Sequence, residues 1–414
     1  MASTQEQISH VVRRMGMGAA GPTIAEFSTP GDAIETLLDR SRPRRHMSEV
    51  QAPTGFEEAR SIEQRQAPLR YLFTELTSGR DPLEERMTWF WHDHFATGAR
   101  KVNVGWLMLQ QHLTVRENAL GNFADLLHAI TTDPAMLVFL DGVDNRLGAI
   151  NENYGREVME LFTIGRGNYT EQDVIEGSRA FSGWVINRPA RRNSDRFTVE
   201  PWESQFVPEF HDAGEKTYLG ITGNLNAEDA INILLDQPTT APNIVAKLYQ
   251  ELVGTQPDPS TLERLSADFA ADYEILPLVR AIVTSAEFLD GDVIGIKIRT
   301  PLERAAGILQ GFGTNAELRF LARSLERVNY LPFNPPNVAG FLTGERLLNP
   351  FSLVHAFDLA GAIRTVPDDI SSTDIMQRLG LFDVSPNTTS VLDTAPNVPT
   401  RIALAINSPE YHLT

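Results

Sequence analysis

The stretch from Asn151 to Gly165, which reads NENYGREVMELFTIG, constrains the fold of this chain more than any other segment. Asn151 can cap a helix by accepting hydrogen bonds from the first free backbone N–H groups. Gly165 suits the left-handed residue that commonly ends a helix. Apolar residues between these two signals recur at helical spacing, so the segment is predicted to be a helix packed against other helices.

The same helix carries a polar stripe. Its members recur at i, i+3, i+4 and i+7 and therefore share one face: Asn153, Arg156, Glu157 and Glu160. One interpretation is a solvated face stabilised by charge pairs such as Glu152–Arg156. The other is the lining of a polar site, because the neighbouring sequence is apolar and aromatic on both sides. In that case we expect Asn151, Asn153 and Arg156 to bind substrate.

Helix-start signals recur along the rest of the chain and predict a mostly α-helical fold. Each combines a side chain that can accept from free backbone N–H groups with a favourable partner three residues later, or with a proline at the first helical position. The signals are Thr170 with Asp173, Asn226, Ser260 with Glu263, and Thr300 with Pro301. We expect residues 1–414 to form one large helical unit.

Two segments depart from this helical pattern. Residues 187–220 have Pro, Arg and Asn punctuation with short β-like runs at Arg196–Val199 and Gln205–Val207, which favours a small antiparallel β excursion. Residues 331–344, LPFNPPNVAGFLTG, are predicted to form a loop rich in proline and glycine. We expect the Asn337–Phe341 part of this loop to form a rim of the site.

The composition excludes several classes of function. A formal net charge of -18 argues against a nucleic-acid-binding surface, which needs clustered Lys and Arg. The absence of cysteine removes disulfides, thiolate nucleophiles and Cys-based zinc or iron–sulfur sites. No apolar run reaches the length of a transmembrane helix or a signal-peptide core. We therefore expect a cytoplasmic protein, with a trimmed export signal as the alternative.

His92 and His94 lie in the aromatic run WFWHDHF, at the end of a predicted helix over Asp81–Phe95. Residues two apart on a helix point to different faces, so both could bind one metal ion only if the helix ends or distorts here. The alternative is one core histidine and one half-exposed histidine. Trp91 in the same run, and Trp184 further along, are candidate aromatic platforms for binding a substrate.

Glu157 and Glu160, one helical turn apart, are candidate acid–base residues. Two carboxylates buried together repel, and the pKa of one then rises toward the range that a general acid needs. A second candidate catalytic group is His211 and Asp212, with Lys216 as a binding residue, in the irregular sequence FHDAGEKTYLG. The alternative there is a β-turn with an Asx-type hydrogen bond from Asp212.

No metal or other cofactor is favoured by the sequence. Without cysteine, a transition-metal site needs histidine together with carboxylate, and His94, His211 and Glu157 are the available combination. Arg156 places a fixed positive charge beside Glu157, which disfavours a cation there. A divalent metal held by these mixed ligands is the alternative.

Nine segments occur in an order that resembles the large bacterial family known as domain of unknown function eighteen-hundred. They are FWHDHF, GNFADLL, DPAMLVFLDG, NENYGREVMELFTIG, YTEQDV, RAFSGW, HDAGEKTYLG, IKIRTPLE and PPNVAGF. The resemblance runs from ISHVVRRMGMGA to SPEY, nearly the whole chain. The family usually has Asn at the position of Asp93 and Trp at the position of Phe341, and neither difference removes a candidate catalytic group.

The resemblance implies a mostly helical protein, often exported, that often occurs alongside a sulfatase- or phosphatase-like family. Such a protein is a candidate partner. The resemblance implies no established reaction, so the reaction has to be inferred from the candidate residues.

Our leading hypothesis is a hydrolase acting on a carbohydrate polymer, with Glu157 or Glu160 as general acid or base, His94 as its partner and Arg156 as orienter. The rival is a non-catalytic binding or assembly module in which Asn153, Arg156 and Glu157 form a structural polar network. We expect the His92/His94 helix end, the Glu157/Glu160 face and the His211–Lys216 loop to converge on one concave pocket.

Overall fold

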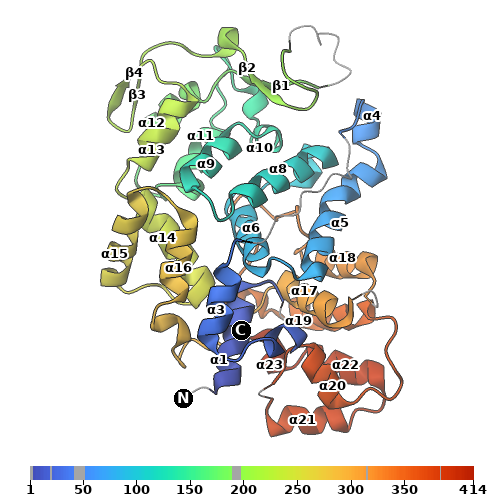
Figure 1. Ribbon diagram of the computed structural model, residues 1–414. Helices are drawn as coiled ribbons and strands as arrows, with labels where there is room; N and C mark the ends of the chain where they lie inside the picture. The colour runs from blue at the N-terminus through green and yellow to red at the C-terminus, as the bar shows by residue number, and fades with distance from the viewer. Residues whose placement is uncertain (1–2, 19–20, 42–51, 189–196, 314–315, 383) are drawn as a thin grey trace.

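The computed structural model describes residues 3–18, 21–41, 52–188, 197–313, 316–382 and 384–414. Helices make up 60% of the described residues, whose strands form two small two-stranded sheets (Figure 1). This confirms the prediction of a mostly α-helical fold with a small antiparallel excursion. Among the described residues, no helix combines the length and the apolar character that crossing a membrane requires.

The helices follow one another along the chain with short connections. In the first half they are α1 Thr4–Met15, α2 Gly21–Ala25, α3 Pro30–Leu38, α4 Phe56–Ala59, α5 Ile62–Ser78, α6 Pro82–His94, α7 Ala99–Val102, α8 Gly105–Asn118, α9 Phe123–Thr131, α10 Pro134–Phe139, α11 Asn153–Glu157 and α12 Glu171–Ala180. In the second half they are α13 Ala227–Leu235, α14 Thr240–Val253, α15 Pro259–Ala270, α16 Ile275–Val283, α17 Pro301–Phe312, α18 Leu318–Arg327, α19 Pro350–Ala356, α20 Ser372–Arg378, α21 Pro386–Asp393, α22 Val398–Ile406 and α23 Pro409–His412.

Most of the predicted helix starts are the observed ones. Capping boxes begin α12, α13 and α17, where the side chain at the cap and the residue three positions later satisfy each other's backbone N–H groups. The start predicted at Ser260 is wrong by two residues. Asp258 caps α15 and accepts from the backbone N–H groups of Ser260 and Thr261. The helix starts there because the next residue, Pro259, already occupies the first helical position.

The β excursion consists of two ribbons at the top of the view in Figure 1. Strand β1, Trp184–Ile186, pairs antiparallel with β2, Ser204–Phe206, and β3, Lys216–Tyr218, pairs antiparallel with β4, Ile221–Gly223. The excursion therefore begins before residue 187 and extends past 220. The run predicted at Gln205–Val207 corresponds to β2. In the run predicted at Arg196–Val199, Arg196 lies outside the described residues and the other three residues form no strand.

The segment that begins at Asn151 lies in the upper part of the molecule. The prediction that Asn151 is the N-cap is wrong by one residue: Glu152 occupies the cap of α11 without a side-chain bond, and Asn151, one position earlier, accepts from the backbone N–H of Asn153 at 3.0 Å. Gly165 is left-handed at φ +82°, as predicted, but the helical turns end at Phe162, with Thr163 as C-cap. The α-helical part stops at Glu157, however, and the chain continues as a π-helical turn, Val158–Phe162, that the sequence did not predict.

Buried charged groups join the helices in the lower half of the molecule. Arg86 of α6 is 2.6 Å from Glu303 of α17 and 2.9 Å from Glu251 of α14. Arg14 of α1 donates to the backbone oxygens of Val293 at 3.1 Å and Thr414 at 2.9 Å. These bonds hold α1 against residues far along the sequence, and Figure 1 shows α1 beside α23.

Candidate functional site

The π-helical turn leaves three successive carbonyl groups free of the regular α-helical bonding pattern, and side chains of other helices bind all three. Lys247 Nζ donates to the oxygen of Leu161 at 2.7 Å, and Asn243 Nδ2 donates to that of Thr163 at 2.5 Å. His94 Nε2 lies 3.0 Å from the oxygen of Phe162. Asn243 and Lys247 are one turn apart on α14, and His94 is the last residue of α6.

The hydrogen bond to Phe162 determines which nitrogen of His94 carries the proton. A carbonyl oxygen can only accept, so Nε2 is the protonated nitrogen and Nδ1 carries a lone pair. Lys247 Nζ lies 3.5 Å from this Nδ1. Burial and the nearby ammonium of Lys247 hold the pKa of His94 well below its ordinary value, so the imidazole is neutral at neutral pH.

Asp93 lies next to His94 and contacts the loop that follows residue 331. Its Oδ1 accepts from the backbone N–H of Phe341 at 2.7 Å. Gly340, at φ +89°, permits this approach, since a Cβ there would lie 2.4 Å from Asp93 Oδ1. Burial raises the pKa of Asp93 to about 7. Burial also lowers the pKa of Lys247 to about 8, partly offset by the charge of Asp93.

His92 points away from His94. Its Nε2 lies 2.7 Å from Nδ1 of His112, and the two rings stack. Burial lowers the pKa of His92 to about 3. The helical geometry of α6 therefore separates the two histidines. This agrees with the alternative of one core histidine and one half-exposed histidine. Within the described ranges, no group of three His, Asp or Glu side chains is placed to hold a metal, so the combination of His94, His211 and Glu157 forms no such site.

The polar stripe of the segment that begins at Asn151 lies at the surface, and three of its residues bind other side chains of the protein. Both guanidinium nitrogens of Arg156 donate to Glu171, at 2.9 and 2.8 Å, and one lies 3.3 Å from Glu152. Asn153 donates to Asp141 at 2.9 Å. Since the guanidinium of Arg156 is already paired with carboxylates, it is poorly suited to orient a substrate.

Glu157 and Glu160 differ in environment although they are one turn apart. Glu157 is half-buried and accepts no hydrogen bond from the described residues, and burial followed by the charge of Glu160 raises its pKa. Glu160 accepts from the hydroxyl of Tyr169 at 2.6 Å and from Arg166 at 2.8 Å, and these bonds lower its pKa. The two pKa values are therefore shifted in opposite directions, which separates an acid from a base.

The residues predicted in the 211–216 loop bind α12 and its end. His211 Nδ1 lies 3.1 Å from the backbone oxygen of Ser182. Arg179 donates to both oxygens of Asp212, at 2.8 and 3.1 Å, and lowers its pKa to about 2. The backbone N–H of Gly214 also donates to Asp212, so the loop contains the Asx-type bond of the structural alternative. Lys216 is 1% exposed. No contact in the described part of the chain joins this group to His94.

The two tryptophans have different environments. Trp91 is fully buried and donates to the backbone oxygen of Ala119 at 3.0 Å, so it cannot serve as a binding platform. Trp184 lines a cavity of about 1040 Å³ beside the first β ribbon, together with Phe206 and Phe210. Asp141, which accepts from Asn153, also lines this cavity, so one end of the polar stripe borders it.

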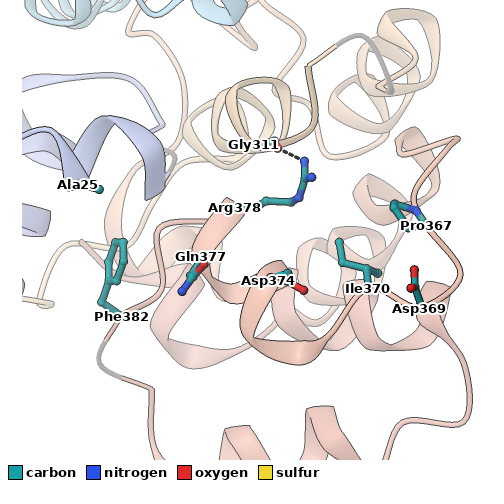
Figure 2. A pocket seen from close by; sticks show the side chains of 9 residues that line it. All are labelled: Ala25, Gly311, Pro367, Asp369, Ile370, Asp374, Gln377, Arg378 and Phe382. Carbon is teal, nitrogen blue, oxygen red and sulfur yellow. Dashed lines mark hydrogen bonds between the residues drawn. The ribbon is translucent and has the colours of Figure 1, made fainter.

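A second cavity, of about 700 Å³, lies between α2 and α20 and contains none of the predicted site residues. Figure 2 shows Arg378 reaching across it to donate to the backbone oxygen of Gly311, at 3.3 Å. Asp374 on its wall already caps α20. Arg378 and Asp374, which is the capping-box partner of Ser371, are thus bound to the protein itself.

Sequence reasoning missed Lys247 and Asn243. The available signal was a lysine within the apolar pattern of α14, IVAKLYQELV, where a charged side chain has to find a polar partner. That partner, the π-helical turn, was not predictable, so the lysine could not be assigned to it.

Comparison with known proteins identifies the family of the chain but no individual relative. No curated protein and no solved structure matches the chain. The sequence model of the family described as Protein of unknown function (DUF1800) matches residues 10–413. Because this match spans nearly the whole chain, the protein belongs to the DUF1800 family.

Proposed function

We propose that the protein is a hydrolase that uses Glu157 as general acid and Glu160 as general base or nucleophile. The observation that carries the proposal is the different bonding of the two carboxylates within one helical turn: Glu160 accepts from Tyr169 and Arg166, whereas the half-buried Glu157 accepts no hydrogen bond from the described residues. A carboxyl group with a raised pKa is the better proton donor of the two, while its ionised neighbour activates water or attacks directly. Partial exposure of both side chains supports access by a substrate.

The roles of the neighbouring residues differ from those first expected. Arg156 holds the stripe through Glu171 and is assigned no contact with substrate. His94 supports the π-helical turn that carries Glu160, so in this scheme it is a positioning residue. Tyr169 and Arg166 keep Glu160 ionised through their hydrogen bonds.

A carbohydrate polymer is the proposed substrate. The cavity lined by Asp141, which accepts from Asn153, offers the aromatic faces of Trp184 and Phe206, whose ring centroids lie 5.6 Å apart, beside polar groups. Aromatic side chains next to carboxylates and amides suit the alternating apolar faces and hydroxyl edges of sugars. A sulfatase- or phosphatase-like protein is retained as the proposed partner, and the cytoplasm as the proposed compartment, with export as the alternative.

The test is a screen of the purified protein against a library of polysaccharides, with new reducing ends as the readout. Glu157→Gln should lower kcat by about 10²- to 10⁴-fold, the usual contribution of a general acid. Glu152→Gln, a change of the same kind on a more exposed glutamate of the same segment, should have little effect. Full activity in Glu157→Gln, or no hydrolysis of any polymer by the wild type, would contradict the proposal.

The rival, a binding or assembly module, is favoured by one observation. Arg156 and Asn153 already have protein partners, as a structural network requires. In that case Arg156→Gln would lower the melting temperature, and Glu157→Gln would change neither stability at neutral pH nor any hydrolytic activity. The same set of variants therefore separates the two functions.

A further inference from the structure

The chain has only four lysines among its 414 residues: Lys101, Lys216, Lys247 and Lys297. Lys101 is paired with Asp141 at 2.8 Å, and Lys297 with Glu251 at 2.6 Å. Lys216 is buried and donates to a backbone oxygen. Lys247 is partly exposed, and no carboxylate of the described residues lies within ion-pair distance of it. Lys247 thus shares the lack of a paired carboxylate with Lys216 and differs from it in its partial exposure and in the imidazole of His94 beside its amine.

The two nearest polar partners of the Lys247 amine are neutral. One is the backbone oxygen of Leu161, at 2.7 Å. The other is Nδ1 of His94, at 3.5 Å, which is the unprotonated nitrogen because Nε2 is bound to Phe162. A lone pair on a fixed imidazole thus faces an amine, an arrangement in which the imidazole can accept a proton from that amine.

An acid lies beside this pair. Asp93 precedes His94 in α6 and is held through one oxygen by the N–H of Phe341, while its charge acts on Lys247. Burial raises the pKa of Asp93 to about 7 and lowers that of Lys247 to about 8. Near neutral pH a fraction of the molecules therefore holds a neutral amine and a protonated carboxyl together.

We propose that Lys247 is a nucleophilic amine that condenses reversibly with the carbonyl group of an aldehyde or ketone, with His94 and Asp93 as its base and acid. Lys247 Nζ forms a bond to the carbonyl carbon, and His94 Nδ1 takes one proton from the nitrogen and passes it to the carbonyl oxygen, which gives the carbinolamine. Asp93 then protonates the hydroxyl of the carbinolamine, the C–O bond breaks, and one water leaves; the proton that remains on the nitrogen returns to the Asp93 carboxylate as the imine forms. The step needs no oxidant or reductant. It does not rest on the hydrolase proposed above.

The test traps the imine by reduction in the intact protein. The protein is treated with glycolaldehyde and sodium cyanoborohydride, and peptide mass spectrometry measures the adduct at each of the four lysines. Lys247 should be labelled at least about tenfold faster than the exposed Lys101 at pH 7.5, because a desolvated amine is more often neutral. The rate at Lys247 should pass through a maximum between about pH 7 and pH 8, where the acid and the amine are both in their reactive forms.

Two variants separate a built site from a lysine that is merely desolvated. Asp93→Asn keeps an acceptor for the N–H of Phe341 but cannot supply the proton, and His94→Gln removes the imidazole base. Each should lower the labelling of Lys247 about tenfold or more and leave that of Lys101 unchanged. Circular dichroism before labelling confirms that each variant is folded.

Two results would overturn the proposal. The first is labelling of Lys247 no faster than that of Lys101 in the folded wild type. The second is an unchanged rate at Lys247 in both variants, which would mean that Asp93 and His94 take no part. Lys247→Arg, which can still donate to Leu161, identifies the adduct by its disappearance. Because the readout is a covalent mass, hydrolytic activity does not affect it.

Discussion

Replacing Asp93 by asparagine should make the protein more stable at pH 8 than at pH 5, relative to the wild type. The carboxyl of Asp93 has its pKa raised from 3.8 to about 7 by burial. Between these two values the folded state binds more protons than the unfolded chain does. The stability that this carboxyl contributes is therefore fully present below pH 3.8 and is lost as the pH rises through about 7. Asparagine does not titrate, and it can still accept from Phe341.

The magnitude follows from the same two pKa values. A shift of about three pKa units means that ionisation of Asp93 destabilises the fold by at most about 4 kcal/mol above pH 7. About a third of this destabilisation is already present at pH 5. Asp93 is partly exposed and lies near the Lys247 cation, and both reduce the free-energy cost of ionising its carboxyl in the folded state. We expect the stabilisation by Asp93→Asn to grow by roughly 2 kcal/mol between pH 5 and pH 8.

The assay is urea denaturation followed by circular dichroism at pH 5, 6, 7 and 8 and constant ionic strength. Asp212→Asn is the matched control. Arg179 lowers the pKa of Asp212 to about 2, so its carboxylate contributes stability above the unfolded pKa, and its loss should be destabilising at all four pH values. If Asp93→Asn instead destabilises the protein equally at pH 5 and pH 8, the Asp93 carboxyl is ionised and compensated in the fold, and the reasoning is wrong.

Three further predictions concern the fold. Gly155→Ala should destabilise the protein by about 1–3 kcal/mol, since a Cβ there would lie 2.2 Å from Ser178 Oγ; an unchanged melting temperature would contradict this close packing. Asp258→Ala should cost about 1 kcal/mol in denaturant unfolding and Ser260→Ala much less, the reverse of what the sequence predicted for the start of α15. Stability should also fall as the pH drops below about 6.5. Burial lowers the pKa of three histidines to about 3, so the unfolded chain binds protons that the folded state does not; a urea midpoint that rises on acidification would refute this. They are His10, His92 and His412.

Local signals were sufficient to predict most of the helices. A capping box such as Thr170 with Asp173 is complete within four residues, and Gly165 needs only its own backbone to adopt the left-handed conformation. The start of α15 failed because two signals overlap there. Two pairs are typical of a helix start: Asp258 with Pro259, and Ser260 with Glu263. The helix begins at the first pair because the ring of Pro259 fixes φ at a helical value.

The candidate site was less predictable because its geometry depends on distant residues. The π-helical turn after Glu157 is bound by side chains of α6 and α14, and no spacing within the motif indicates this. Periodicity correctly grouped Asn153, Arg156 and Glu157 on one face but could not show that Glu171 would pair with Arg156. Similarly, an aromatic pattern does not distinguish a buried Trp91 from a platform in a cavity such as Trp184.

The bonds of Arg14 have a consequence for how the chain acquires its structure during synthesis. Its partners, Val293 and Thr414, lie 279 and 400 positions later, so a ribosome that has completed α1 must add most of the remaining chain before Arg14 can bind them. Until then one side of α1 has no native surface to cover it, and the nascent chain depends on chaperones or on transient local contacts to avoid aggregation. An early helix thus stays incompletely locked until residues near the other end of this sequence have been made.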